Sequence, residues 1–331
     1  MNNRRRLLIA LGTSALASPF ASIAEQQEKI RRIGYLGARS RSTAANPDPY
    51  QDAFVDGMRT LGYVEGRNLK IEWRFAENKL ERLPELATQL AALNLEVIVT
   101  HATPAVSALS QATKTVPIVT ASMGEPIAGG FTTSLSRPSG NITGLSPITI
   151  DLLPKQLELL KTMVPALSRV AFVTTPGNLN SAARLQVIQD AGKVLGIHIA
   201  VVEANSPEEI EQAFATIRRE KVQAILVQAA TFFIGSRRRV ADLTVRSGLP
   251  SMFAYREDVL AGGLMSYGQN TADQHRRSAT FVDKILKGAK PGDLPIEQPT
   301  KIILSINRKA ASRLRIKIPQ SLLISADEVF E

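Results

Sequence analysis

The sequence has 331 residues, 44% hydrophobic and 21% charged, a composition that excludes a disordered chain and a length that predicts two domains of ordinary size. It contains no cysteine, which excludes disulfides, thiolate metal sites, cysteine nucleophiles and a lipid-anchored cysteine. The net charge is +10, and it falls to +7 (37 basic minus 30 acidic residues) without the first 24 residues. The basic residues are spread singly along the chain, apart from the run 237–239, so no nucleic-acid partner is expected.

Residues 1–24 predict a secretory signal peptide. Arg4, Arg5 and Arg6 precede an apolar run and small residues, and 22–24 (SIA) form an acceptable cleavage site. The apolar run is too short to cross a bilayer as a stable helix, and a non-cleaved membrane anchor is the alternative. The paired arginines are loosely twin-arginine-like, with Asn3 where Ser or Thr is usual, so the Sec and twin-arginine routes both stay open. We therefore expect a periplasmic protein.

Strands and helices alternate through the first half of the chain. The patterns predict, in order, a strand at 32–37, a helix at 49–62, a strand at 69–73, a helix at 80–93, a strand at 96–100, a helix from Pro104 and a strand at 116–121. Strands separated by helices of ten to fifteen residues indicate a parallel sheet that helices cover on both faces.

The second half repeats this order. It predicts strands at 169–175, 197–202, 224–227 and 249–255, with helices at 181–195, from 206 and at 237–247. Ser206 precedes Pro207, Glu208 and Glu209, which indicates a serine-capped helix with acids in its first turn.

A direct repeat links the two halves. Residues 116–131 (VPIVTASMGEPIAGGF) align without a gap with 249–264 (LPSMFAYREDVLAGGL) at an offset of 133 (249 − 116). The flanking elements match in the same order, so we expect an α/β protein of two topologically similar lobes, each a parallel sheet flanked by helices.

The expected boundaries follow from the turn-rich stretches. A signal peptide covers 1–24, the first lobe covers 30–147 plus about 296–331, and the second lobe covers 148–295. The proline-rich segment 290–299 is the expected return crossing, and a strand at 302–306 with a helix at 308–314 is expected to complete the first lobe.

Few catalytic patterns occur. The sequence lacks a Gly-x-Gly-x-x-Gly after the first strand, a phosphate-binding loop and a Gly-x-Ser-x-Gly elbow. His101, His198 and His275 have no metal-ligand spacing. We expect His198 to be packed or at a sheet edge and His275 to be exposed, and we expect no enzyme, cofactor or metal.

The carboxyl ends of the strands indicate where a ligand binds, because open α/β sheets bind ligands there. Six segments, 37–42, 101–104, 122–125, 176–181, 228–233 and 255–258, are expected to form a cleft between the lobes. The candidate ligand-binding residues are Ser40, Tyr50, His101, Thr103, Ser122, Asn178, Asn180, Phe232, Tyr255 and Asp258.

Several of these candidates have a second interpretation. Thr103 and the helix amides at 104–106 suit a carboxylate, or Thr103 is a plain helix cap. Phe232 and Phe233 stack on a ligand or belong to the core. Asn178 and Asn180 form a turn or donate hydrogen bonds to a ligand.

Two segments carry a resemblance to a known family. Residues 101–144, with SRPSGNITG, and 249–270, with AGGLMSYGQN, resemble an ABC-transporter substrate-binding family that includes tryptophan- and phenylalanine-type binding proteins. The resemblance covers essentially all of the mature chain. It implies a type I periplasmic-binding-protein fold, with two Rossmann-like lobes, a three-strand hinge and closure around one small ligand. The family usually has Gly-Asp-Pro at 124–126 and Asn-Pro at 178–179, where this chain has Gly-Glu-Pro and Asn-Leu, so the ligand's identity stays open.

The expected function is that of a monomeric periplasmic receptor. It would deliver a small zwitterionic or anionic ligand, such as an aromatic amino acid, to an ABC permease and ATPase in the inner membrane. A ligand-sensing receptor for a membrane signalling protein and a periplasmic enzyme are the alternatives. A repressor-like regulator on the same fold is disfavoured, because a signal peptide stands where the DNA-binding headpiece would be.

Overall fold

The computed structural model describes residues 29–331 except 46, 139 and 178–180. Residues Arg31–Glu331 form one compact unit. The predicted signal peptide lies outside the described residues, and so do the candidates Asn178 and Asn180. Among the residues that are described, no helix has both the length and the apolar character needed to cross a membrane.

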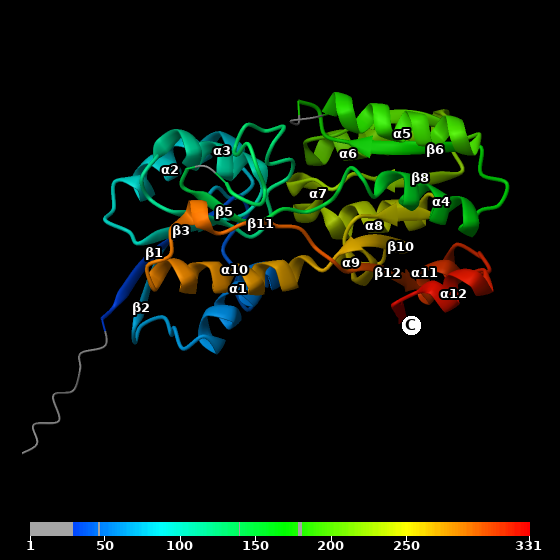
Figure 1. Ribbon diagram of the computed structural model, residues 1–331. Coiled ribbons are helices and arrows are strands. Elements are labelled where there is room, and N and C mark those ends of the chain that lie inside the picture. The colour runs from blue at the N-terminus through cyan, green and yellow to red at the C-terminus, as the bar shows by residue number, and fades with distance from the viewer. Residues whose placement is uncertain (1–28, 46, 139, 178–180) are drawn as a thin grey trace, which may run out of the picture. The chain divides into compact units, whose positions relative to one another are not determined.

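The first lobe is built on a six-stranded, fully parallel sheet (Figure 1). The strand order is β11-β5-β4-β3-β1-β2, with β1 (Arg31–Gly37), β2 (Leu69–Phe75), β3 (Val97–Thr100), β4 (Ile118–Thr120), β5 (Ile142–Leu145) and β11 (Ile296–Glu297). One face packs on α1 (Pro49–Thr60) and α10 (Thr271–Leu286), and the other on α2 (Leu83–Ala91) and α3 (Thr103–Ala112). The short 3-10 helices η1 (Leu80–Arg82) and η2 (Pro291–Asp293) precede α2 and β11.

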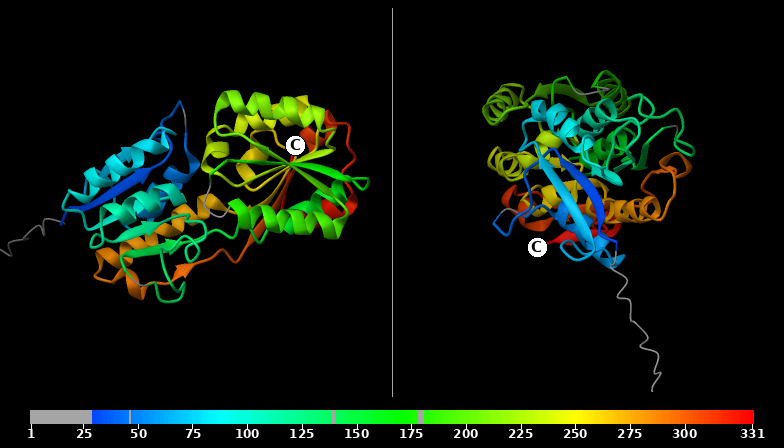
Figure 2. Two further views of the ribbon diagram at one scale, coloured as in Figure 1. Left: turned by 90° about the horizontal axis from the view of Figure 1, so that it is seen from above. Right: turned by 90° about the vertical axis from the view of Figure 1, so that its left-hand side faces the viewer.

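The second lobe has a seven-stranded sheet with one antiparallel pair, β10 with β12. Its order is β13-β12-β10-β9-β8-β6-β7, with β6 (Arg169–Thr174), β7 (His198–Glu203), β8 (Ala224–Val227), β9 (Ser251–Phe253), β10 (Met265–Gln269), β12 (Ile302–Asn307) and β13 (Glu328–Phe330). Figure 2 shows this twisted sheet between its helices. One face packs on α4 (Leu153–Met163), α5 (Ser181–Leu195), α11 (Arg308–Arg313) and α12 (Gln320–Ser325), and the other on α6 (Pro207–Arg219) and α8 (Arg237–Arg246). The short helices α7 (Thr231–Gly235) and α9 (Arg256–Leu260) follow β8 and β9.

Local sequence explains where the helices begin. The Asp48 carboxylate accepts hydrogen bonds from the amides of Tyr50 (2.9 Å) and Gln51 (3.3 Å) at the start of α1. Ser206 Oγ accepts from the Glu209 amide at 3.2 Å, which confirms the predicted serine cap of α6. Each such cap satisfies a helix amide that would otherwise lack a partner.

The internal repeat is confirmed by the topology. The order β2-β1-β3-β4-β5 in the first lobe equals β7-β6-β8-β9-β10 in the second. The bounds of β4 and β9, 118–120 and 251–253, differ by the same offset of 133 that aligns the two sequence segments. The chain is therefore an α/β protein of two similar lobes, as the sequence predicted.

The structure differs from the predicted lobe boundaries near the C-terminus. In the described part of the chain, three segments cross between the lobes: 146–152, Asn270 and 298–301. The first lobe therefore includes α10 and β11, whereas 148–295 was expected to lie wholly in the second lobe. Strands β12 and β13 join the second sheet, whereas 302–331 was expected in the first. The reason is that a strand's own apolar pattern does not specify which sheet edge it pairs with.

Candidate functional site

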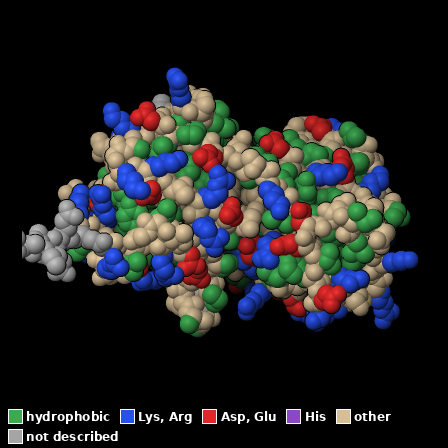
Figure 3. Space-filling view, turned by 60° about the horizontal axis from the view of Figure 1, so that its bottom comes forward, with side chains coloured by type: hydrophobic (Ala, Val, Ile, Leu, Met, Phe, Trp, Pro, Cys, Tyr) green, Lys and Arg blue, Asp and Glu red, His purple; other side chains and the backbone are tan. Residues whose placement is uncertain are grey.

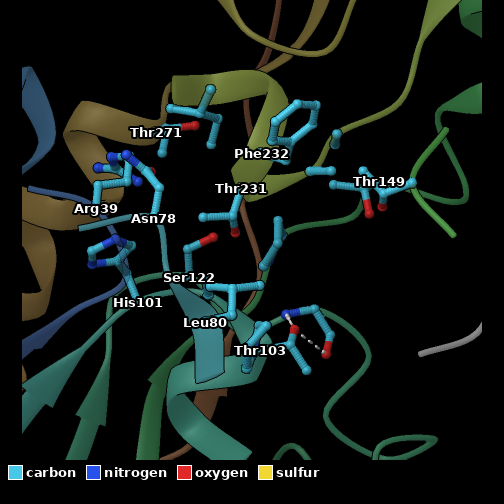
Figure 4. A pocket seen from close by; sticks show the side chains of 18 of the residues that line it. Arg39, Asn78, Leu80, His101, Thr103, Ser122, Thr149, Thr231, Phe232 and Thr271 are labelled. Carbon is cyan, nitrogen blue, oxygen red and sulfur yellow. Dashed lines mark hydrogen bonds between the residues drawn. The ribbon is translucent and has the colours of Figure 1, made fainter. Parts of the chain in front are cut away.

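A cavity of about 660 Å³ lies between the lobes. It is lined from both sheets at the carboxyl ends of their strands, where ligands of open α/β sheets bind. Each of the six predicted strand-end segments contributes residues to its lining. Taken in chain order, one residue from each segment, these are Arg39, His101, Ser122, Gly177, Phe232 and Tyr255. Figure 4 shows Phe232 and Thr231 of the second lobe facing Ser122 and His101 of the first. The predicted location of the cleft is confirmed.

Of the ten candidate residues, six line the cavity: Tyr50, His101, Thr103, Ser122, Phe232 and Tyr255. Ser40 does not line it, and its carbonyl accepts a hydrogen bond from Gln51 Nε2 at 2.8 Å. Asp258 is 6% exposed and lies behind the cavity wall, 3.9 Å from Arg237 Nε. That the six residues contact a ligand stays a prediction.

Thr103 fixes the first-lobe wall through the backbone of Gly124. The Gly124 amide donates to Thr103 Oγ1 at 3.1 Å, and the Thr103 hydroxyl lies 3.4 Å from the Gly124 carbonyl oxygen (Figure 4). The N-cap of α3 is Ala102, not Thr103. The plain-cap interpretation of Thr103 is therefore wrong, because its hydroxyl ties the start of α3 to the loop after β4. Contact of Thr103 with a ligand stays a prediction.

The amino end of α3 offers few free amides to an anion. Pro104 has no amide hydrogen, and the amides of Ala105 and Val106 donate to the Ala102 carbonyl oxygen at 3.1 and 3.2 Å. A helix N-terminus attracts an anion mainly through unsatisfied amides. The carboxylate site that the sequence suggested at 104–106 is therefore weak.

Three of the six described residues other than glycine with a positive φ angle line the cavity from the first lobe. Asn78, Ala102 and Glu125 have φ angles of +64°, +69° and +53°, and all three line the cavity. Such conformations cost about 1–3 kcal/mol for a residue with a side chain, and they persist where the surrounding structure enforces them. Strain of this kind clusters at ligand sites, which strengthens the assignment of the cavity as the functional site.

Two buried histidines line one end of the cavity. His275 is 1% exposed, and its Nδ1 donates to the Thr271 carbonyl oxygen at 2.8 Å, so its Nε2 is an acceptor. His101 is 2% exposed, and its Nδ1 lies 3.3 Å from the Tyr35 hydroxyl. Burial lowers the pKa of His275 to about 4 and lowers that of His101 well below its ordinary value. Both rings are therefore neutral near pH 7.

The expectation that His275 is exposed was wrong. His275 is followed on α10 by two arginines, but the face of α10 that carries Thr271, His275, Ser278 and Val282 is buried. These positions recur every three to four residues, so they share one side of the helix. Because that face carries polar side chains, the sequence pattern did not indicate that it is buried. His198, by contrast, is exposed on the edge strand β7, as one of the two predictions for it stated.

Tyr50 joins the two lobes beside the cavity. Its ring stacks on His275, with centroids 5.1 Å apart and an interplanar angle of 21°. Its hydroxyl donates to Glu257 Oε2 at 3.0 Å and accepts from Arg237 at 3.3 Å, and both partners belong to the second lobe. Burial raises the pKa of Tyr50 well above its ordinary value, so the hydroxyl keeps its proton.

The aromatic pair after β8 divides between its two predicted roles. Phe232 lines the cavity and is half-buried, whereas Phe233 is 5% exposed and belongs to the hydrophobic core. Tyr255, across the cavity from the first lobe, is 9% exposed, and burial raises its pKa to about 12. Phe232 and Tyr255 therefore supply aromatic surface to the second-lobe wall.

Sequence reasoning missed the charged groups of the cavity. Arg39 is buried and its Nε donates to Asp48 at 2.8 Å. Arg184 of α5 and Glu125 of the loop after β4 line the same cavity from opposite lobes. A signal for Arg184 does exist, because it lies in the first turn of a helix that follows a strand end, where side chains reach a cleft.

No group of three or more histidine, aspartate or glutamate side chains in the described ranges is placed to hold a metal ion. On the face that Figure 3 shows, lysine and arginine side chains alternate with acidic ones and form no single basic surface. The cavity lining offers hydroxyl groups, single charges and aromatic faces, such as those of Ser122, Arg184 and Phe232, which are groups that hold an organic ligand.

The chain matches a family model over residues 47–330, and the model describes ABC transporter substrate binding proteins. A tyrosine-binding protein of Clostridioides difficile is 24% identical over 285 residues, which are 85% of this chain and 81% of that protein.

Two solved structures are similar over almost the whole chain. A conserved domain protein from Vibrio cholerae has a TM-score of 0.82 and 26% identity, over 91% of this chain and 100% of that one. An ABC domain from Streptococcus pneumoniae in complex with L-Trp has a TM-score of 0.80 and 27% identity, over 91% and 99% of the two chains.

Proposed function

Because the chain belongs to the family of ABC transporter substrate-binding proteins, we propose that it is the receptor that captures a small solute and delivers it to an ABC importer. The solute is an amino acid or another small carboxylate, bound between the lobes. The observation that carries this proposal is the cavity of about 660 Å³ at the carboxyl ends of the strands of both lobes.

Family membership also bears on two sequence predictions. The family consists of substrate-binding proteins, which confirms that the chain is a binding protein and not an enzyme. The relatives support the ligand class, because one of them is named for tyrosine and another holds L-Trp. Phe232 and Tyr255 supply the aromatic faces that a ligand of this kind would contact.

We place the mature receptor in the periplasm, after removal of residues 1–24, as a monomer that meets a permease and an ATPase at the inner membrane. The leader pattern of arginines followed by apolar and small residues supports this location. Genes for a permease and an ATPase beside the gene for this chain would support the transport role. A membrane kinase or chemoreceptor gene in that position would favour the sensing role instead.

Capture requires the lobes to close around the solute. The three crossings between the lobes supply a hinge, and the hydrogen bond from Tyr50 to Glu257 joins the lobes at the edge of the cavity. Ligand binding should therefore favour a more compact state. Small-angle scattering with and without ligand measures this compaction, and an unchanged radius of gyration would contradict closure.

Native mass spectrometry of the protein purified from its own periplasm tests the binding function. We expect one small molecule per chain. A thermal-shift screen with the twenty L-amino acids and small carboxylates is the second measurement, because a ligand at 100 times its Kd adds about 2.7 kcal/mol to the free energy of unfolding. The proposal fails if no solute co-purifies and none stabilises the protein.

A further inference from the structure

Arg184 is a cavity-lining cation to which the described residues offer no hydrogen bond or ion pair. Its side chain is 6% exposed, its Nη1 is buried with no hydrogen-bond partner, and among the described residues it forms no ion pair. Burial lowers the pKa of Arg184, yet a guanidinium keeps its proton in proteins. A buried charge without a counter-charge is strongly unfavourable. An anion supplied by the ligand would remove this cost.

The other cavity-lining arginine is already neutralised. Arg39 makes an ion pair with Asp48 at 2.7 Å. Arg237, behind the wall, lies 3.9 Å from Asp258 and donates to the Tyr50 hydroxyl. Arg184 thus differs from both, because among these three arginines it alone makes no ion pair with a described carboxylate.

Glu125 faces the same cavity from the opposite lobe. It follows β4, is half-buried, and is held at a φ of +53°. Burial raises the pKa of Glu125, and the positive charge of Arg184 lowers it, so the two groups sense each other. Among the described residues no ion pair joins Glu125 to Arg184, whose buried Nη1 has no hydrogen-bond partner. The two opposite charges therefore lie on the two sides of a space that a ligand can fill.

We propose that the ligand's head group is that of an α-amino acid, with its carboxylate on Arg184 of the second lobe and its ammonium on Glu125 of the first. This inference rests on the proposed function, and it assigns the charged residues that select the ligand. Only a zwitterion compensates both residues at once. A simple carboxylate leaves Glu125 without a partner, and a simple amine leaves Arg184 without one, so each is disfavoured. The ligand then bridges the lobes through its own two charges.

Calorimetric titration of the mature protein tests the assignment. The probes are the twenty L-amino acids and, for the tightest of them, its amide and its deaminated acid. Arg184→Gln should weaken binding of the amino acid by about 10- to 100-fold, the value of a charge-assisted hydrogen bond, and should leave the affinity for the amide nearly unchanged. Glu125→Gln should weaken the amino acid similarly and leave the deaminated acid nearly unchanged. Arg184→Lys should recover part of the affinity, because it restores the charge.

Two matched variants control the comparison. Lys193→Gln removes an exposed charge from the same helix, α5, outside the cavity. Glu85→Gln removes an exposed acidic residue of the first lobe, on α2 and outside the cavity. Both should bind the amino acid as the wild type does. Circular dichroism and melting curves establish that every variant is folded.

The inference is overturned if the wild type binds none of the twenty amino acids, or if Arg184→Gln weakens the amide as much as the amino acid. It is also overturned if Glu125→Gln binds the amino acid as tightly as the wild type does. A different solute found by native mass spectrometry would remove this head-group assignment while leaving the receptor function intact. If no solute binds at all, both the assignment and the receptor function fail.

Discussion

Ser122 and Tyr255 hold equivalent places in the two lobes. Each follows the end of its strand, β4 or β9, by two residues, and each lines the cavity. Their positions differ by 133, the offset of the sequence repeat. The internal duplication therefore places Ser122 on the first-lobe wall of the cavity and Tyr255 on the second-lobe wall.

The first prediction concerns this pair. Tyr255→Ala should weaken ligand binding by about 1–3 kcal/mol, because it removes an aromatic face and a hydroxyl from the second-lobe wall. Ser122→Ala should cost about 1 kcal/mol, the value of one neutral hydrogen bond. Calorimetric titration with the solute found by native mass spectrometry measures both.

Tyr255→Phe serves as the control, because it keeps the ring and removes only the hydroxyl. If Tyr255→Ala sharply lowers the melting temperature of the ligand-free protein, and the folded fraction binds with unchanged affinity, Tyr255 acts as a core residue and the prediction fails.

The second prediction uses His275, whose pKa burial lowers to about 4. Between pH 4 and about 6.5 the unfolded chain binds a proton at this residue and the folded chain does not, so falling pH destabilises the fold. Wild type should therefore lose stability relative to His275→Gln as the pH falls through this window, by on the order of 3 kcal/mol. Urea unfolding of both proteins at each pH measures the difference, and a constant difference would show that His275 is not buried as the neutral form.

The third prediction has the opposite sign. Burial raises the pKa of Asp258 to about 7, although Arg237 lowers it. Between about pH 4 and 7 the folded chain keeps this proton and the unfolded chain has lost it, so the stabilisation present at low pH is lost as the pH rises. Asp258→Asn should thus gain stability relative to wild type from pH 4 to 7. The same unfolding series tests this, and a constant stability difference between the two proteins over that window would mean that Arg237 keeps Asp258 ionised in the folded chain.

The fourth prediction concerns Gly268 in β10. A Cβ on this residue would lie 2.0 Å from the Ala254 carbonyl oxygen, a backbone atom that cannot move without separating β9 from β10. Gly268→Ala should therefore destabilise the protein by about 3 kcal/mol or more. In Gly235→Ala the new methyl group would meet only the flexible side chain of Asn78 at 3.2 Å, so this control should be nearly neutral. Equal melting temperatures for the two variants would contradict the prediction.

The sequence predicted the parts of the fold that depend on local pattern. The helix at 181–195 and the strand at 224–227 have the predicted bounds, and the repeat located β4 and β9. The lobe to which α10 and β12 belong could not be predicted in this way. A helix or strand pattern indicates which residues are buried, but it does not indicate which sheet they pack against or pair with.

For the candidate site, too, the sequence predicted what depends on local pattern and missed what depends on tertiary packing. Strand-end position was enough to identify His101, Ser122 and Tyr255 as residues of the cavity. It did not identify Arg184 or His275, because an arginine or histidine in a polar helix is usually exposed and only tertiary packing buries these two.

The route of the chain between the lobes has a consequence for the order of folding. Neither lobe can be completed from a continuous stretch of nascent chain, since the first lobe needs α10 and β11 and the second needs β12 and β13. An N-terminal domain usually folds while the rest of the chain is still being made. The first lobe of this protein cannot do so, because α10 and β11 are made after most of the second lobe. The first core becomes complete only once β11 (Ile296–Glu297) has been made, and the second only once β13 (Glu328–Phe330) has been made. Until then each core stays unfinished and open to whatever machinery handles unfolded chains.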